Sequence, residues 1–169
     1  MAAILTVAIV GIVVYLFFFV FFPLGRGAIY DPSSANETRM IADLADVQRG
    51  EKAADLGSGD GRVVIALAFK GAESHGYEVN PVLVLISRRN IRMAGLAGRA
   101  FIHWGSFWRK DLSRYQLITV FQVGFVMARL EAKLSRELAP GARVVSHYWR
   151  FPSLSPERTQ GNIYRYRIG

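Results

Sequence analysis

The chain has 169 residues, which is enough for one compact domain but not for two. About half of the residues are apolar, so a sizeable core is expected, and the absence of cysteine excludes disulfides, thiolate metal sites and a cysteine nucleophile. The net charge of +8 fits nucleic acid or an anionic membrane as a partner. We interpret it as a solvated basic face beside a membrane, and expect no nucleic-acid partner.

The first 25 residues carry no charged side chain. Residues 3–22 are apolar enough to cross the hydrocarbon core as a helix, and the features of a cleaved signal peptide are missing. We therefore predict a transmembrane anchor over residues 1–25 and a folded domain over residues 26–169. Because Arg26 and Arg39 follow the anchor, we expect a single-pass protein with its N-terminus outside and the domain in the cytoplasm.

The predicted domain begins with a helix and continues as alternating strands and helices. Ser34 and Glu37 have the spacing of a capping box, which predicts a helix from there to about Gly50. The alternation that follows predicts an α/β fold, with a mostly parallel sheet covered by helices on both faces. The predicted strands cover residues 51–56, 74–78, 100–104, 116–123, 142–149 and 162–168, and the predicted helices cover residues 63–69, 81–93 and 124–138.

Two of these helices have apolar positions that predict a buried face. In residues 124–138 the predicted buried stripe is Met127, Leu130, Leu134 and Leu138. In residues 81–93 the side predicted to face the sheet carries Val82, Leu85, Ile86 and Met93. About twenty residues remain after the strand over 142–149, which leaves little chain for an acceptor pocket.

The rest of the chain is organised around the turn over residues 55–61, Asp-Leu-Gly-Ser-Gly-Asp-Gly, between a predicted strand and helix. Such glycines let a ligand approach the backbone and the N–H groups of a helix N-terminus. Arg62 stands where the dinucleotide fingerprint requires its last glycine, which argues against NAD or FAD. Glu78 ends the next predicted strand, where α/β sheets place a carboxylate that binds ribose hydroxyls.

Asp55, the glycine turn and Glu78 together resemble the S-adenosylmethionine site of class I methyltransferases. The resemblance implies a single Rossmann-like domain in which Asp55 lies near the methionine amino group and Glu78 holds the ribose. It also implies that Ser106 hydrogen-bonds the adenine amine and that Phe107 stacks on the ring. The full set of predicted cofactor-binding residues is Asp55, Gly57, Ser58, Gly59, Gly61, Glu78, Asn80, Ser106 and Phe107.

The catalytic motifs that the chain lacks limit which chemical group can be the methyl acceptor. The chain has Gln122-Val123-Gly124-Phe125 where enzymes that methylate base or glutamine nitrogens carry an Asn/Asp-Pro-Pro-aromatic loop. We expect no metal site, and interpret the histidines at 75, 103 and 147 as core or rim residues. An amine acceptor fits, since the protein then only has to align a neutral amine and exclude water. The candidate aromatic walls are Tyr30, Trp108, Phe125, Trp149 and Phe151.

Four segments, residues 55–64, 76–84, 107–112 and 130–134, resemble in sequence and order a family of membrane-anchored protein-lysine methyltransferases. These are related to the enzymes that modify the adenine nucleotide translocase and the ATP synthase c subunit. Tyr30, Pro32 and Ser33 are similar to the family's aromatic-x-Pro-Ser/Thr segment.

The resemblance implies methyl transfer from S-adenosylmethionine to a lysine amine of a protein, with Tyr30, Pro32 and Gln122 positioning the acceptor. Ser106 departs from the family, which tends to have an acid there. An anchored domain reaches only targets near the bilayer, so we expect a membrane-associated protein substrate, in a mitochondrial membrane if the protein is eukaryotic. Two alternatives stay open: a methyltransferase for a small molecule or lipid headgroup, and a non-catalytic scaffold that binds S-adenosylmethionine.

Overall fold

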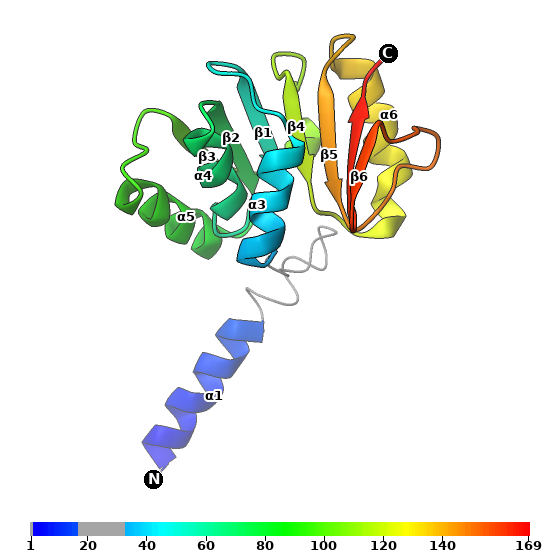
Figure 1. Ribbon diagram of the computed structural model, residues 1–169. Coiled ribbons are helices and arrows are strands. Elements are labelled where there is room, and N and C mark those ends of the chain that lie inside the picture. The colour runs from blue at the N-terminus through cyan, green and yellow to red at the C-terminus, as the bar shows by residue number, and fades with distance from the viewer. Residues whose placement is uncertain (1, 17–32) are drawn as a thin grey trace.

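The computed structural model describes residues 2–16 and 33–169. Residues 33–169 form an α/β domain around a seven-stranded sheet with the order β3-β2-β1-β4-β5-β7-β6 (Figure 1). Neighbours from β3 to β5 pair in parallel, whereas β7 runs antiparallel to β5 and β6. The predicted Rossmann-like fold with a mostly parallel sheet is confirmed.

The strands lie close to their predicted positions. They are β1 (Lys52–Leu56), β2 (Glu73–Glu78), β3 (Ala100–Trp104), β4 (Leu117–Val120), β5 (Arg143–His147), β6 (Arg158–Gln160) and β7 (Ile163–Arg167). Strand β6 was not predicted, because its three residues are exposed and show no apolar pattern. With β7 it forms an antiparallel hairpin at one edge of the sheet.

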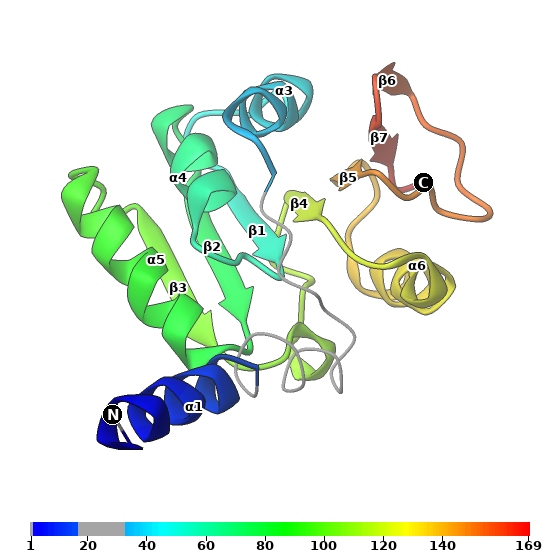
Figure 2. The ribbon, with the colours of Figure 1, turned by 90° about the horizontal axis from the view of Figure 1, so that it is seen from below.

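The helices cover both faces of the sheet. The α-helices are α1 (Ala2–Leu16), α3 (Ala35–Leu44), α4 (Arg62–Phe69), α5 (Pro81–Met93) and α6 (Met127–Glu137), and the 3-10 helices are η2 (Phe107–Arg109) and η3 (Gly124–Val126). Helices α3, α4 and α5 lie on one face and α6 on the other (Figure 2). Alternation along β1 divides the core between the faces, because Ala53 packs with α3 and α4 while Ala54 and Leu56 pack with α6.

The capping box at Ser34 and the buried stripe of α6 are both confirmed. The face predicted for α5 is wrong. Leu85 and Met93 are 66% and 72% exposed, and the helix instead buries Leu83, Val84, Ser87 and Ile91. Apolar residues lie on both sides of this helix, so the periodicity alone did not select the side that packs on the sheet.

The prediction of a single-pass membrane protein is wrong. Within residues 2–16 and 33–169, the structure contains no helix with the length and apolar character needed to cross a bilayer.

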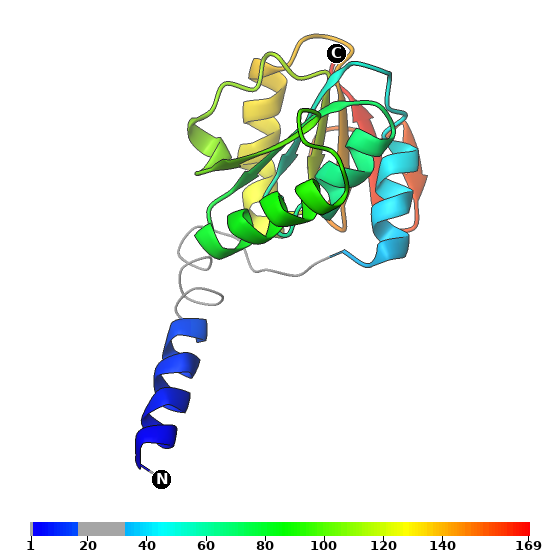
Figure 3. The ribbon, with the colours of Figure 1, turned by 90° about the vertical axis from the view of Figure 1, so that its left-hand side faces the viewer.

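Helix α1 stands apart from the α/β domain (Figure 3), and its side chains from Ile4 to Val13 are exposed. Residues 17–25 of the predicted anchor lie outside the described residues, as does the predicted boundary between residues 25 and 26. The division of the chain into 1–25 and 26–169 therefore stays a prediction.

Candidate functional site

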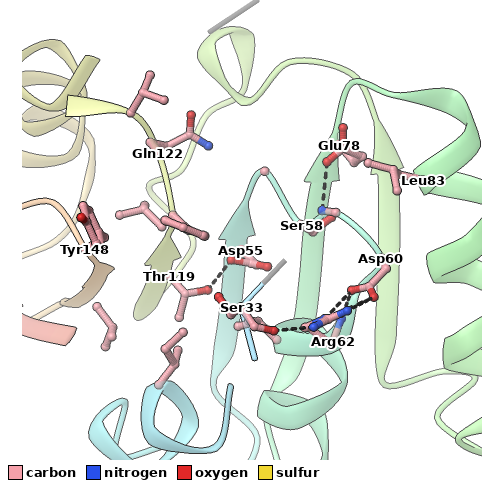
Figure 4. A pocket seen from close by; sticks show the side chains of 18 of the residues that line it. Ser33, Asp55, Ser58, Asp60, Arg62, Glu78, Leu83, Thr119, Gln122 and Tyr148 are labelled. Atoms are coloured by element: carbon pink, nitrogen blue, oxygen red, sulfur yellow. Dashed lines mark hydrogen bonds and ion pairs between the residues drawn. The ribbon is translucent and has the colours of Figure 1, made fainter. Parts of the chain in front are cut away.

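A cavity of about 300 Å³ opens beyond the carboxyl ends of β1, β2 and β4 (Figure 4). Its volume lies at the lower end of the range for small-molecule sites, and its place is where open α/β sheets bind ligands. The lining comes from the glycine turn, the end of β2, the segment after β4, the segment after β5, and Ser33 ahead of α3.

The glycine turn adopts backbone conformations that residues with a side chain reach only with strain. Gly57, Gly59 and Gly61 have φ values of 92°, 53° and 84°, in the left-handed region that favours glycine. A Cβ on Gly57 would also lie 2.5 Å from Nε2 of Gln122. That Nε2 donates a hydrogen bond of 2.8 Å to the carbonyl of Leu56, so the Gln122 side chain is held against the turn.

Glu78 fixes the turn from the neighbouring strand. Its Oε2 accepts a hydrogen bond of 2.9 Å from the N–H of Gly59, and its Oε1 accepts one of 2.7 Å from the N–H of Asn80. Burial raises the pKa of the Glu78 carboxyl, and these backbone bonds oppose the rise. Each oxygen has a further lone pair, so Glu78 can still accept hydrogen bonds from a ligand.

Asp55 is buried at the end of β1. Its Oδ1 accepts a hydrogen bond of 2.7 Å from the hydroxyl of Thr119, its register partner on β4. Burial raises the pKa of Asp55 to about 7, with the nearby Glu78 and Asp60 carboxylates adding to the rise and the Thr119 bond opposing it. The cavity therefore contains a carboxyl that a bound cation would ionise fully.

Arg62 connects the turn to the segment ahead of α3. Its guanidinium contacts both oxygens of Asp60, with Nε 2.9 Å from Oδ1 and Nη2 2.6 Å from Oδ2, and its Nη1 donates to the carbonyl of Ser33 (Figure 4). The residue that breaks the dinucleotide fingerprint thus holds Ser33 at the wall of the cavity.

The structure brings most of the predicted cofactor residues together. The cavity is lined by Asp55, Gly57, Ser58, Gly59, Glu78 and Asn80. Gly61 is the N-cap residue of α4, and a Cβ there would lie 2.8 Å from the Cβ of Ser87, so its role is the packing of α4 against α5. The side-chain oxygen of Asn80 caps α5 by accepting from Val82 and Leu83.

Ser106 and Phe107 do not line the cavity, so the geometry does not support their predicted contacts with adenine. Phe107 is packed in the core and Ser106 caps η2, because the chain turns into this 3-10 helix directly after β3. Of the predicted acceptor residues, Gln122 lines the cavity, whereas Tyr30 and Pro32 lie outside the described residues.

The predicted aromatic walls divide in a similar way. Trp149 lines the cavity and Phe125 is 80% exposed, but Phe151 is a core residue and Trp108 packs against the same core. Among the residues that the structure describes, no group of three or more His, Asp or Glu side chains could hold a metal ion.

Thr119 and Tyr148 also line the cavity, and Thr119 was not predicted there. Thr119 is the polar residue in the apolar run 117–121, and a polar residue within a predicted buried strand was a usable signal. Tyr148 follows β5 with a φ of 71°, a conformation that is unusual outside glycine and that tends to occur at functional sites. No pattern in the sequence indicates that conformation.

The strand order with β7 inserted antiparallel, the glycine turn after β1 and the acid ending β2 define the fold and site of a class I methyltransferase. The particular family follows from comparison with known proteins. Residues 55–158 match the family model of the ANTKMT methyltransferase domain, and the chain belongs to this family.

Similar proteins with established names are also methyltransferases. The chain is 37% identical over 130 residues to the mouse lysine N-methyltransferase named for the ATP synthase c subunit, and the match spans 77% of this chain and 52% of the mouse protein. It is 34% identical over 150 residues to a protein-lysine N-methyltransferase of Saccharolobus islandicus, covering 83% of this chain and 93% of that protein. The chain thus spans about half the length of the mouse protein and nearly all of the Saccharolobus protein.

A solved structure gives the same fold. The RNA methyltransferase from Salinibacter ruber, in complex with S-adenosyl-L-homocysteine, matches with a TM-score of 0.78 and 34% identity, covering 82% of this chain and 94% of that one. The names of these relatives therefore include both protein and RNA as substrates.

Proposed function

We propose that this chain is an S-adenosylmethionine-dependent protein-lysine N-methyltransferase. The observation that carries the proposal is the acid-lined cavity at the glycine turn, in a chain that belongs to the ANTKMT methyltransferase family. The relatives in mouse and Saccharolobus are named as lysine methyltransferases, which supports lysine as the acceptor.

The groups around the cavity fit S-adenosylmethionine, whose amino group and sulfonium are positively charged. Three carboxyl groups line the cavity, from Asp55, Asp60 and Glu78, and Arg62 is paired with one of them. The glycines allow close approach of the backbone. Leu83 and Val120 add apolar surface that suits the adenine base. We assign Asp55 to the cationic methionine end and Glu78 to the ribose hydroxyls.

When bound, S-adenosylmethionine supplies a methyl group already activated on sulfur. The chain's own residues then have to orient the amine and exclude water. Gln122 commits its Nε2 to the turn, which leaves its Oε1 to accept a hydrogen bond from the amine. Tyr148 and Trp149 line the cavity and supply aromatic surface for the lysine stem.

The test uses tritiated S-adenosylmethionine with total protein, total RNA and total lipid from the source organism, each incubated with the full chain. We expect label in protein, recovered as methyl-lysine after acid hydrolysis. Glu78→Ala should lose the transfer, while Glu73→Gln, at the other end of β2 with a half-exposed side chain, should keep it.

Label recovered only in nucleosides would favour an RNA substrate, in line with the name of the Salinibacter protein. Label only in lipid would favour the lipid-headgroup alternative. A folded chain that binds S-adenosylmethionine but labels none of the three extracts would favour the small-molecule alternative or the scaffold. Absence of binding would overturn the assignment of the site.

A further inference from the structure

Ser33, His147 and Glu37 form a hydrogen-bonded chain that leads away from the cavity. Ser33 lines the cavity (Figure 4), and its Oγ lies 3.1 Å from Nδ1 of His147. On the other side of the ring, Nε2 of His147 lies 3.3 Å from Oε1 of Glu37. Ser33 and His147 are 7% and 4% exposed, whereas the Glu37 side chain is 41% exposed.

We propose that Ser33 and His147 remove the proton from the acceptor ammonium before methyl transfer, with Glu37 as the residue that positions His147. This inference rests on the proposed function, because it needs an amine acceptor in the cavity. It assigns a role to His147, which the sequence indicated only as a core or rim residue.

The chemistry requires such a step. A lysine side chain has a pKa of about 10.4 and is protonated near neutral pH. Its nitrogen has no lone pair to attack the methyl carbon until one N–H bond is broken. Burial in an apolar pocket lowers the pKa of the amine, but the proton must still leave to a base.

The proton balance is simple. One N–H bond of the ammonium breaks and its proton passes to Oγ of Ser33, while the hydroxyl proton of Ser33 passes to Nδ1 of His147. The imidazolium that forms donates its Nε2–H to the Glu37 carboxylate. The neutral amine then forms the N–CH3 bond as the S–CH3 bond breaks and the electron pair stays on sulfur. His147 returns its proton to water once the product leaves.

The surroundings of His147 favour this role. Glu37 on α3 is the carboxylate that faces it, and hydrogen bonds from Ser34 hold the pKa of Glu37 below its usual range, with His147 contributing. Phe121, directly after β4, contacts His147 at 4.4 Å between ring centroids with the two rings tilted by 46°, and the register partner Ile163 on β7 carries no charge. The ion pair of Arg62 with Asp60 lies beyond Ser33, where Arg62 binds its carbonyl.

A purely structural role, in which the contacts of His147 with Ser33 and Glu37 only hold α3 against β5, explains these contacts less well. Helix α3 is already capped by Ser34, whose N–H donates to Oε2 of Glu37 and whose Oγ accepts from the N–H of Glu37. That box leaves Oε1 of Glu37 to meet His147. The Ser33 carbonyl is bound by Arg62, so its hydroxyl is not needed to hold Ser33 in place.

The test compares wild type with His147→Gln, Ser33→Ala and Ser33→Thr, all as full chains, and His103→Gln on β3 is the matched histidine control. The single-turnover rate of methyl-lysine formation on total protein extract is measured from pH 6.5 to 9.5. Calorimetry measures the affinity for S-adenosylhomocysteine and so tests the cofactor site separately from the rate.

We expect His147→Gln and Ser33→Ala to lower the rate at pH 7 by about 100-fold. Their rates should rise about tenfold per pH unit as the free amine forms in solution, so that the gap from wild type nearly closes at pH 9.5. Ser33→Thr keeps the hydroxyl and should keep most of the rate. Cofactor affinity should change less than about twofold in all four variants.

A second readout does not depend on activity. In the full chain labelled with ¹⁵N-histidine, we expect the neutral His147 ring to carry its proton on Nε2, with His147→Gln assigning the signal. A proton on Nδ1 would overturn the proposal, and so would a loss of rate that is the same at every pH. If wild type forms no methyl-lysine at all, the proposed function itself fails, which is a distinct result.

Discussion

The hydroxyl of Thr119 donates a hydrogen bond of 2.7 Å to Oδ1 of Asp55 across neighbouring parallel strands. The bond stabilises the charged carboxylate, yet burial prevails and raises the pKa of Asp55 to about 7. A carboxyl kept partly neutral in a cavity lined by two further acids is costly to ionise until a cation arrives. The acid-lined cavity therefore favours a cationic ligand.

Replacing Asp55 by Asn should stabilise the ligand-free chain at alkaline pH. Because the folded pKa of about 7 lies above the ordinary 3.8, the stability contributed by Asp55 is complete below about pH 4 and is lost as pH rises through 7. Asp55→Asn removes this loss, so it should match wild type near pH 4 and exceed it by about 1–3 kcal/mol at pH 8. Urea unfolding at both pH values measures the difference. Equal stability at pH 8 would contradict the raised pKa.

Binding of S-adenosylmethionine should release a proton near pH 6. The cationic ligand favours ionised Asp55, whose proton then goes to the buffer. Calorimetry at pH 6 in buffers of different ionisation enthalpy should give a release of about 0.5–1 proton, falling to none at pH 8.5. Asp55→Asn, measured at higher ligand concentration, should release none. Proton uptake at pH 6 would count against the assignment of Asp55 to the cationic end of the ligand.

Glu78 should matter both for the turn and for the ligand. Glu78→Ala removes the acceptor for two backbone N–H groups and, in the proposed assignment, for the ribose hydroxyls. We expect S-adenosylmethionine affinity to fall at least tenfold, equivalent to about 1.5–3 kcal/mol. Glu78→Gln keeps one acceptor oxygen and should lie between Ala and wild type. Calorimetry on these variants and on the control Glu73→Gln gives the comparison, and unchanged affinity in Glu78→Ala would place the ribose elsewhere.

Gly57 and Gly98 form a matched pair for testing the turn. Both have positive φ, at 92° and 88°, but a Cβ on Gly57 meets Gln122 Nε2 at 2.5 Å while one on Gly98 meets no atom within 4 Å. Gly98→Ala should cost about 1 kcal/mol of stability from φ alone, and Gly57→Ala about 2–4 kcal/mol. Thermal unfolding and cofactor titration separate them, since only Gly57→Ala should also lose binding. Equal effects would mean that the close approach of Gln122 is unimportant.

Local patterns predicted much of the fold. The Ser34 capping box, the start of α5 at Pro81 and the apolar stripe of α6 are each encoded within a few residues, and local hydrogen bonds and packing confirm them. The glycine turn and Glu78 were found because positive φ and a strand-end acid leave a sequence signature. The face of α5 and strand β6 left no such signature, because the choice of face depends on neighbouring elements and β6 is entirely exposed.

The sequence by itself determined the alternation of strands and helices, the turn over residues 55–61 and the acids at 55 and 78, since each depends on local backbone preference and spacing. Only the tertiary structure decided which side chains meet. Parallel pairing of β1 with β4 joins residues 55 and 119, and packing of α3 beside β5 joins Ser33 to His147, 114 residues away. It also decided that Phe107 belongs to the core. Contacts between distant segments arise from packing of the whole sheet, which no short stretch of sequence encodes.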